Sequence, residues 1–105
     1  MRGDIPLFGR HSHTACEYKG SVVIFGGERK YNSILAIRET LNDVYMFNPD
    51  KAEWKYLKSI GRPIEHRRGH SATIWDKYMY VYGGINSEGK YLRDLWHFNF
   101  SMCLL

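Results

Sequence analysis

The chain has 105 residues, of which 44% are hydrophobic and 25% charged, which is typical of one small globular unit. Its net charge of +4 is interleaved with acidic residues, and like charges run no longer than two, which argues against a nucleic-acid partner. No stretch resembles a signal peptide or a membrane span, so we expect a cytoplasmic chain that is neither secreted nor bound to a membrane.

The first half of the chain contains four predicted strands, rich in aromatic and β-branched residues. They are HTACEY (13–18), SVVIFGG (21–27), DVYMFN (43–48) and EWKYLKS (53–59). Lys19-Gly20 suits a tight hairpin between the first two strands, and the unbroken apolar run of the second predicts burial on both faces. A long loop over residues 28–40 joins the second strand to the third.

The second half repeats this pattern, first at an offset of 57 residues and then of 51. The matched positions are Pro6 with Pro63, Arg10 with Arg67, His13 with His70, Ala15 with Ala72, Gly26-Gly27 with Gly83-Gly84, Asp43 with Asp94, and Tyr45 with Trp96. The offset changes between the glycine pair and the aspartate, where a surface loop can absorb an insertion.

Each repeat predicts up to four antiparallel strands, which is the sheet unit of a β-propeller blade. The predicted blades cover residues 1–58 and 59–105. The second lacks its fourth strand, because FSMCLL stands where the first repeat has a turn and a tryptophan. Propellers close with roughly four to eight blades, so we expect a piece of a larger propeller, or self-association of this chain to complete one.

The order of residues also resembles a known family. Each repeat carries P-x-x-x-R-x-x-H-[ST]-A, an apolar strand ending in a glycine pair, and L-x-D-[VL]-[YW]-x-F-N; Trp54 then follows in the first. Over residues 6–58 and 63–99 this order resembles the kelch repeat, and the Pro-Arg-His lead resembles kelch proteins that act as scaffolds and adaptors. The resemblance implies an all-β propeller that binds another protein, without catalysis or cofactor. The alternative is a fragment of a propeller enzyme that acts on a small molecule at the central channel.

The repeated positions are expected to have structural roles. The glycine pairs permit positive φ where backbones pass closely. Asp43 and Asp94 are expected to accept hydrogen bonds from loop backbone or from an arginine such as Arg10 or Arg67, because a buried charge needs a partner. Trp54 is expected to fill the gap between adjacent blades.

The loop at residues 28–40 is the strongest candidate for a partner surface. Ile34, Leu35 and Ile37 lie between charged flanks, which suits an apolar contact with a polar rim. The resemblance places such loops at the end of the propeller where partners are held. The alternative is that residues 34–37 pack on a neighbouring blade or form a helical turn. The candidate contact residues are Arg29, Tyr31, Ile34, Leu35, Ile37 and Arg38 in this loop, Arg62 and Ile64 between the blades, and Asn86 and Lys90 in the matching loop of the second repeat.

Other motifs suggest chemistry that their surroundings do not support. GGINSEGKY (83–91) contains G-x-x-x-x-G-K, but Tyr91 replaces the Ser or Thr of a phosphate loop and a strand pattern follows instead of a helix. Residues 86–89 therefore predict a turn. His13 and His70 are repeat equivalents, so we expect structural histidines rather than two ligands of one metal ion. Cys16 lies in mid-strand, where a thiol acts as a small buried hydrophobe.

Overall fold

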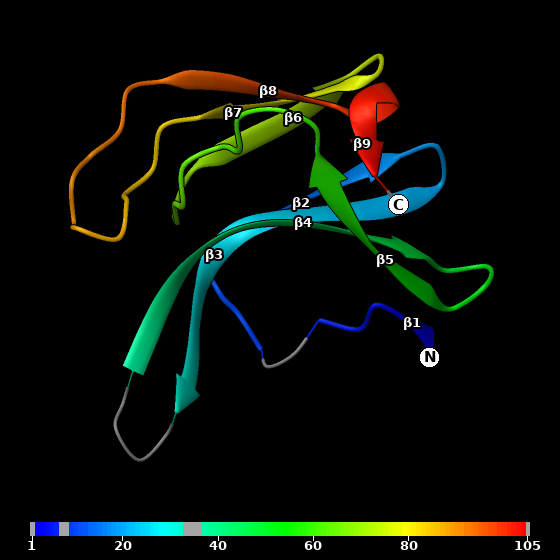
Figure 1. The fold of residues 1–105 in the computed structure, drawn as a ribbon, viewed down its shortest axis with the longest axis horizontal. Coiled ribbons are helices and arrows are strands. Elements are labelled where there is room, and N and C mark those ends of the chain that lie inside the picture. The colour runs from blue at the N-terminus through cyan, green and yellow to red at the C-terminus, as the bar shows by residue number, and fades with distance from the viewer. Residues whose placement is uncertain (1, 7–8, 33–36, 105) are drawn as a thin grey trace.

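The computed structural model describes residues 2–6, 9–32 and 37–104, which form two β-sheets that face one another (Figure 1). The first sheet has the strand order β1-β5-β4-β3-β2, and the second has the order β6-β7-β8. The strands are β1 (Arg2–Gly3), β2 (Thr14–Tyr18), β3 (Ser21–Asn32), β4 (Ile37–Asn48), β5 (Glu53–Ser59), β6 (Ser71–Trp75), β7 (Tyr78–Tyr82) and β8 (Leu95–Asn99). Within the sheets only β1, against β5, runs parallel to its neighbour among the described strands.

The chain turns back toward the first sheet after β8. A short 3₁₀ helix, η1 (Phe100–Met102), leads to β9 (Cys103–Leu104), which pairs antiparallel with the end of β5. The ring of Phe100 stacks on Tyr18 of β2 with centroids 4.2 Å apart. The all-β prediction is confirmed, and the described part of the second sheet has three strands. Among all the residues that the structure describes, no helix is long and apolar enough to cross a membrane.

Tight hairpins join β2 to β3 and β6 to β7, the first two predicted strands of each repeat. Lys19 and Gly20 have φ angles of 49° and 82°, and Asp76 at the equivalent turn has a φ of 56°. Positive φ at these positions matches the right-handed twist of the flanking strands, which is why two residues are enough to reverse the chain. The turns fix the register in which Tyr18 lies opposite Ser21, and Trp75 opposite Tyr78.

The hydrophobic core lies between the two sheets. Because side chains alternate along a strand, only every second residue of each strand points inward. The buried residues are Val23, Phe25, Val44 and Leu57 from the first sheet, Met79, Val81 and Phe98 from the second, and Ile64 from the segment between them. Neither sheet could bury these side chains alone, so the fold depends on both.

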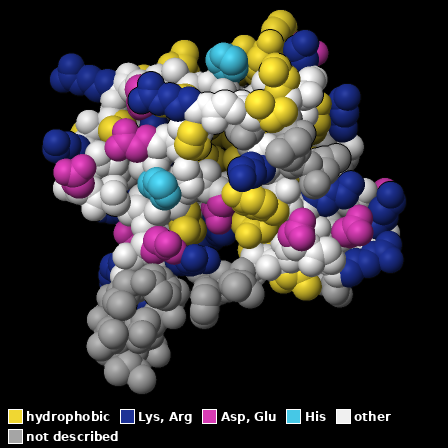
Figure 2. Space-filling view, viewed as in Figure 1, with side chains coloured by type: hydrophobic (Ala, Val, Ile, Leu, Met, Phe, Trp, Pro, Cys, Tyr) yellow, Lys and Arg dark blue, Asp and Glu magenta, His cyan; other side chains and the backbone are white. Residues whose placement is uncertain are grey.

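Each sheet also has an outer face, turned away from the core. On the first sheet this outer face carries Val22, Ile24, Tyr45, Phe47, Trp54 and Tyr56, which are opposite one another in the strand register. On the second sheet it carries Trp75, Tyr78, Tyr80, Tyr82, Leu95 and His97. Figure 2 shows hydrophobic side chains at the surface on the side of the second sheet.

Trp54, which is predicted to fill the gap between adjacent blades, does not lie between the two sheets of this chain. Trp54 lies on the outer face of the first sheet, where its ring contacts Tyr45 and Phe47 of β4. The reason is the alternation of β5. Leu57 points into the core, so Trp54, three residues earlier, points the opposite way.

The prediction of a long loop over residues 28–40 is wrong, because most of these residues belong to strands. β3 continues past its glycine pair to Asn32, and β4 begins at Ile37. The register shifts between Phe25 and Gly27, where Asn42 and Asp43 of β4 face the single residue Gly26, so the bulge lies on β4. Pairing resumes with Gly27 opposite Leu41. We call the extension, Glu28–Asn32 with Ile37–Thr40, the arm. In Figure 1 it projects away from both sheets.

Candidate functional site

A buried or half-buried arginine precedes the first hairpin of each repeat and binds the repeated aspartate. Arg67 is 0% exposed, and its Nη1 and Nη2 donate to Asp94 Oδ1 and Oδ2 at 2.7 and 2.8 Å. Arg10 makes the same bidentate pair with Asp43, with Nη2 3.0 Å from Oδ2. Each arginine also donates to the carbonyl of the first glycine of its pair. The predicted aspartate–arginine contacts are confirmed.

The guanidinium of Arg67 controls the charge of Asp94. Its hydrogen bonds lower the pKa of the Asp94 carboxyl to about 2, and the Trp96 Nε1 donor, 2.6 Å from Oδ2, acts in the same direction. The carboxylate therefore stays ionised through the physiological range and holds Trp96, a partly buried ring packed on the core. This arrangement supports the fold and is not suited to proton transfer at neutral pH.

The second glycine of each pair allows a close approach of two backbones. Gly27 has a φ of 95°, and a Cβ there would lie 2.6 Å from the carbonyl oxygen of His11. Gly84 has a φ of 100°, and a Cβ there would lie 2.8 Å from the oxygen of Arg68. In both repeats the residue after the pair exchanges two backbone hydrogen bonds with the segment ahead of the first hairpin. The expected role of the pair is therefore confirmed.

His70 joins the two sheets. Its Nε2 lies 2.9 Å from Thr14 Oγ1 of β2, and its ring meets the Phe25 ring edge-on at 5.0 Å. Burial, and next the nearby charge of Arg67, lower the pKa of His70 to about 4, so the ring is neutral at physiological pH. Its repeat equivalent His13 is exposed. Among the described residues, no three His, Cys, Asp or Glu side chains gather as a metal site requires.

One carboxylate at the base of the arm holds four segments together. Glu28 is 8% exposed. Its Oε1 accepts a hydrogen bond from Arg38 Nη1 at 3.1 Å, and its Oε2 forms an ion pair with Arg68 Nε at 3.1 Å. His11 Nε2 lies 3.4 Å from Oε1. Glu28 therefore ties β3 to β4 and to the segments ahead of both hairpins, which fixes the arm relative to the two sheets.

The arm has a mixed-charge surface and open backbone edges. Arg29 binds Glu39 across the two strands, with Nε and Nη2 at 2.7 and 2.6 Å from Oε1, and Lys30 lies opposite Arg38 in the register. Figure 2 shows acidic and basic side chains close together at the base of the arm. Among the described strands, none pairs with Lys30–Asn32 on the side away from β4, or with 37–40 on the side away from β3. Such edges can accept another extended segment.

The structure brings some of the sequence-predicted contact residues onto the arm. Arg29 and Arg38 lie there, and Tyr31 and Ile37 are within its strands. The predicted contacts Ile34 and Leu35 lie outside the described residues. Sequence reasoning missed Glu28, Glu39 and Arg68, although the mixture of acids and bases at 28–30 and 38–39 could have indicated cross-strand pairs.

Two other predicted contact residues are buried, which corrects their assignment. Ile64 is 6% exposed and packs in the core between the sheets. Asn86 is also buried, and its Nδ2 donates to Glu65 Oε2 at 3.0 Å. Of the remaining candidates, Lys90 is exposed, and Arg62 is exposed with its guanidinium 5.4 Å from the centre of the Trp96 ring.

The segment that resembles a phosphate loop is a turn, as predicted. Asn86 Oδ1 accepts hydrogen bonds from the backbone nitrogens of Glu88 and Lys90, both at 3.0 Å, and Gly89 N donates to Asn86 O. Ile85 forms bridges with Arg68 on one side and Tyr91 on the other. β8 follows this turn, and no helix N-terminus within the described ranges faces it, whereas a phosphate loop requires one.

Two facing sheets from one repeated sequence, each with a glycine pair and an arginine–aspartate pair, define blades of a β-propeller. A family model described as the KLHDC2/KLHL20/DRC7 Kelch-repeats domain matches residues 1–103, and the chain belongs to the kelch-repeat family.

Proteins of quite different names are similar to this chain. It is 32% identical to the Rho GTPase-activating protein gacHH of Dictyostelium discoideum over 90% of this chain and 6% of that protein. It is 31% identical to the leucine-zipper-like transcriptional regulator 1 homolog of Drosophila melanogaster, over 90% of this chain and 10% of that protein. The solved structure titled "Structure of YjhT" aligns with a TM-score of 0.62 and 30% identity, covering 75% of this chain and 22% of that one. The chain spans less than a quarter of each.

Proposed function

We propose that this chain is part of a protein–protein interaction module, a scaffold or adaptor without chemistry of its own, and that the arm contacts the partner. The observation that carries the proposal is the arm itself. It is a two-stranded extension that Glu28 fixes at its base and that leaves open backbone edges between paired charges. Neither sheet needs such an extension for its core, since the second sheet has no counterpart among the described strands.

The comparisons support binding more than catalysis. The chain matches 6% of the length of a protein named as a GTPase-activating protein and 10% of one named as a transcriptional regulator. A small unit that occurs in proteins with such different names fits a common binding role better than one fixed reaction. The arm could then bind an extended segment through its edges, with charges selecting the partner.

The proposal is tested by reversing one charge on the arm. Lys30→Glu changes the exposed surface but places the new carboxylate opposite Arg38, so the arm should keep its pairing. Immobilised wild-type chain and this variant would be incubated with labelled cell extract, and the retained proteins quantified by mass spectrometry. We expect a defined set of proteins to be lost from the variant.

The matched control is Lys51→Glu. Lys51 is exposed in the turn after β4, at the end of that strand opposite the arm. The control should retain what the wild-type chain retains. Equal retention by all three chains would exclude the arm as the contact, and a wild-type chain that retains no protein would argue against a binding module.

A further inference from the structure

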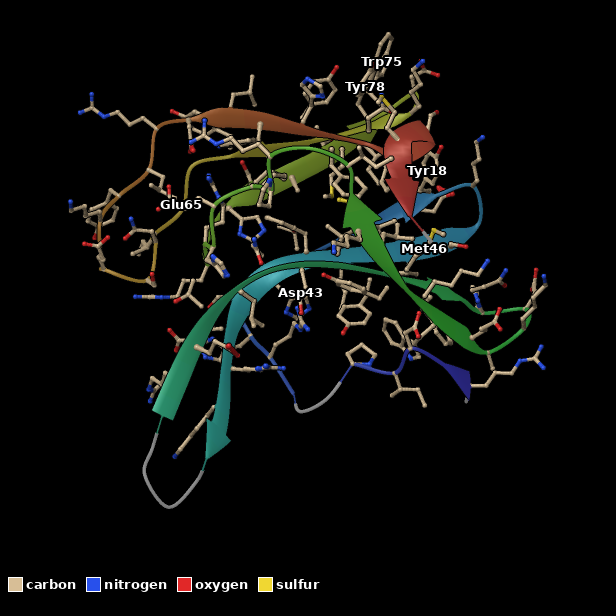
Figure 3. All side chains as sticks on the ribbon, viewed as in Figure 1. Tyr18, Asp43, Met46, Glu65, Trp75 and Tyr78 are labelled. Carbon is tan, nitrogen blue, oxygen red and sulfur yellow. The ribbon has the colours of Figure 1, made fainter. Side chains whose placement is uncertain are left out.

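The outer face of the second sheet is apolar and uncovered. Trp75, Tyr82 and Leu95 are 71%, 53% and 67% exposed. Tyr82 and Leu95 are paired on β7 and β8, and Trp75 lies at the other end of the same face, opposite Tyr78. Figure 3 shows Trp75 and Tyr78 pointing away from the first sheet. A contiguous aromatic face of this kind on a folded protein marks a binding surface rather than scattered exposure.

The internal repeat shows what fits this face. Tyr80, Tyr82 and Leu95 are the repeat equivalents of three residues of the first sheet, at the offsets of 57 and 51. Those equivalents, Val23, Phe25 and Val44, are fully or almost fully buried against the second sheet. The equivalent face of the first sheet therefore already forms one half of the interface between the two sheets.

The other half of that interface is also duplicated. Met79, Val81 and Phe98 form the inner face of the second sheet. Their repeat equivalents are Val22, Ile24 and Phe47, which lie on the outer face of the first sheet.

Polar groups agree with this match. The contact of Thr14 Oγ1 with His70 Nε2 at 2.9 Å has the equivalents Ser71 and His13. Both of these are exposed in this chain, so the pair is available to form between two molecules.

We propose that the outer face of the second sheet binds the outer face of the first sheet of a second copy of this chain. The contact repeats the interface inside the chain and is continuous with it, so it adds blades in the same direction. Because the two halves differ, the association is head to tail, and it continues until a ring closes or an open stack forms. The arm lies outside both faces, so the inference does not rest on the proposed function.

The test uses one variant for each face. Tyr82→Lys places a charge on the outer face of the second sheet, and Val22→Lys does so on the first, where Glu17 lies directly opposite in the register. Sedimentation velocity over a wide concentration range should show association of the wild-type chain and loss of association for each variant. An equimolar mixture of the two variants should give a discrete dimer, because each retains the face that the other needs.

Each other outcome overturns the inference. A wild-type chain that stays monomeric throughout, or a mixture that stays monomeric, excludes the contact. Self-association of Val22→Lys alone would show that two second-sheet faces pair with each other, which excludes the head-to-tail direction. Near-ultraviolet circular dichroism checks that each variant is folded. Leu95→Lys and Tyr56→Lys, which alter exposed residues on the same two faces, give a second pair if one variant is not.

Discussion

A single buried arginine sets the charge between the two sheets. Arg67 donates to both oxygens of Asp94 and to the carbonyls of Gly83 and Glu65, so its charge is neutralised and its donors are used. Burial of the ring lowers the pKa of His70, and the neighbouring charge of Arg67 lowers it further, because a second cation beside Arg67 would be costly. The neutral histidine can then bind Thr14 and join the two sheets.

The low pKa of His70 predicts a loss of stability in mild acid. The folded-state pKa is about 4 and the ordinary value is 6.5, so the unfolded chain takes up the proton first as pH falls. The contribution of His70 is full above pH 6.5 and decreases as pH falls toward about 4. Urea unfolding followed by tryptophan fluorescence, at pH about 7 and about 5, should show the decrease.

The matched variants for this prediction are His70→Gln and His66→Gln. The first should flatten the dependence of stability on pH, and the second, at an exposed histidine, should leave it unchanged. Asp94 does not interfere, because its pKa is lowered from 3.8 to about 2 and its contribution is lost only below that window. An unchanged slope in His70→Gln would show that other groups cause the acid sensitivity.

Local signals in the sequence were enough to predict some elements but not the arm. The hairpin at Lys19-Gly20 and the turn that begins at Asn86 depend on residues next to one another, and the structure confirms both. The arm depends on Glu28 meeting Arg68, forty residues later, which only the folded chain brings together. Charged residues after a glycine pair favour a loop by propensity, and this tertiary contact overrides that preference.

The placement of individual side chains was also partly hidden in the sequence. Ile64 was predicted as a contact residue because it lies between blades, yet an isoleucine there fills the core where the two sheets meet. The direction of Trp54 could have been found, because it differs in parity from Leu57 on the same strand. The duplicated interface was present in the repeat itself, but its two faces are identified only from the strand register.

At the scale of the arm, the ion pairs of Glu28 should contribute more to the free energy of unfolding than any exposed ion pair. Glu28→Gln removes a buried charge that faces Arg38, Arg68 and His11, and we expect the free energy of unfolding to fall by about 1–3 kcal/mol. Urea unfolding measures the change. Hydrogen exchange should show faster exchange of the amides of Arg29 and Lys30.

The control for the arm is the exposed carboxylate on the opposite strand. Glu39→Gln weakens only the pair with Arg29, and an exposed pair contributes at most about 1 kcal/mol. If the two variants lose the same stability, the contact of Glu28 with the segment ahead of β6 does not anchor the arm.

At the scale of the whole molecule, the two sheets share one core and cannot be stable apart. The buried side chains of β3 and β4 pack against those of β7 and β8, and His70 and Phe100 add contacts to β2 from the second half of the chain. Unfolding of either sheet would expose the inner face of the other. Repeat proteins of this kind derive their cooperativity from the interface between neighbours rather than from each unit alone.

A cavity in the second sheet should therefore loosen the first. Met79→Ala, at a fully buried side chain, should lower the free energy of unfolding by about 2–5 kcal/mol, and should lower the hydrogen-exchange protection of Val23 and Val44 to the same extent. Leu95→Ala removes a similar volume from the exposed face of the same sheet and should change neither quantity when the chain is dilute enough to be monomeric. If Met79→Ala weakens protection only in β6–β8, the sheets unfold separately. Head-to-tail association would then stabilise only the sheet at each contact, because no shared core would couple the two sheets of one chain.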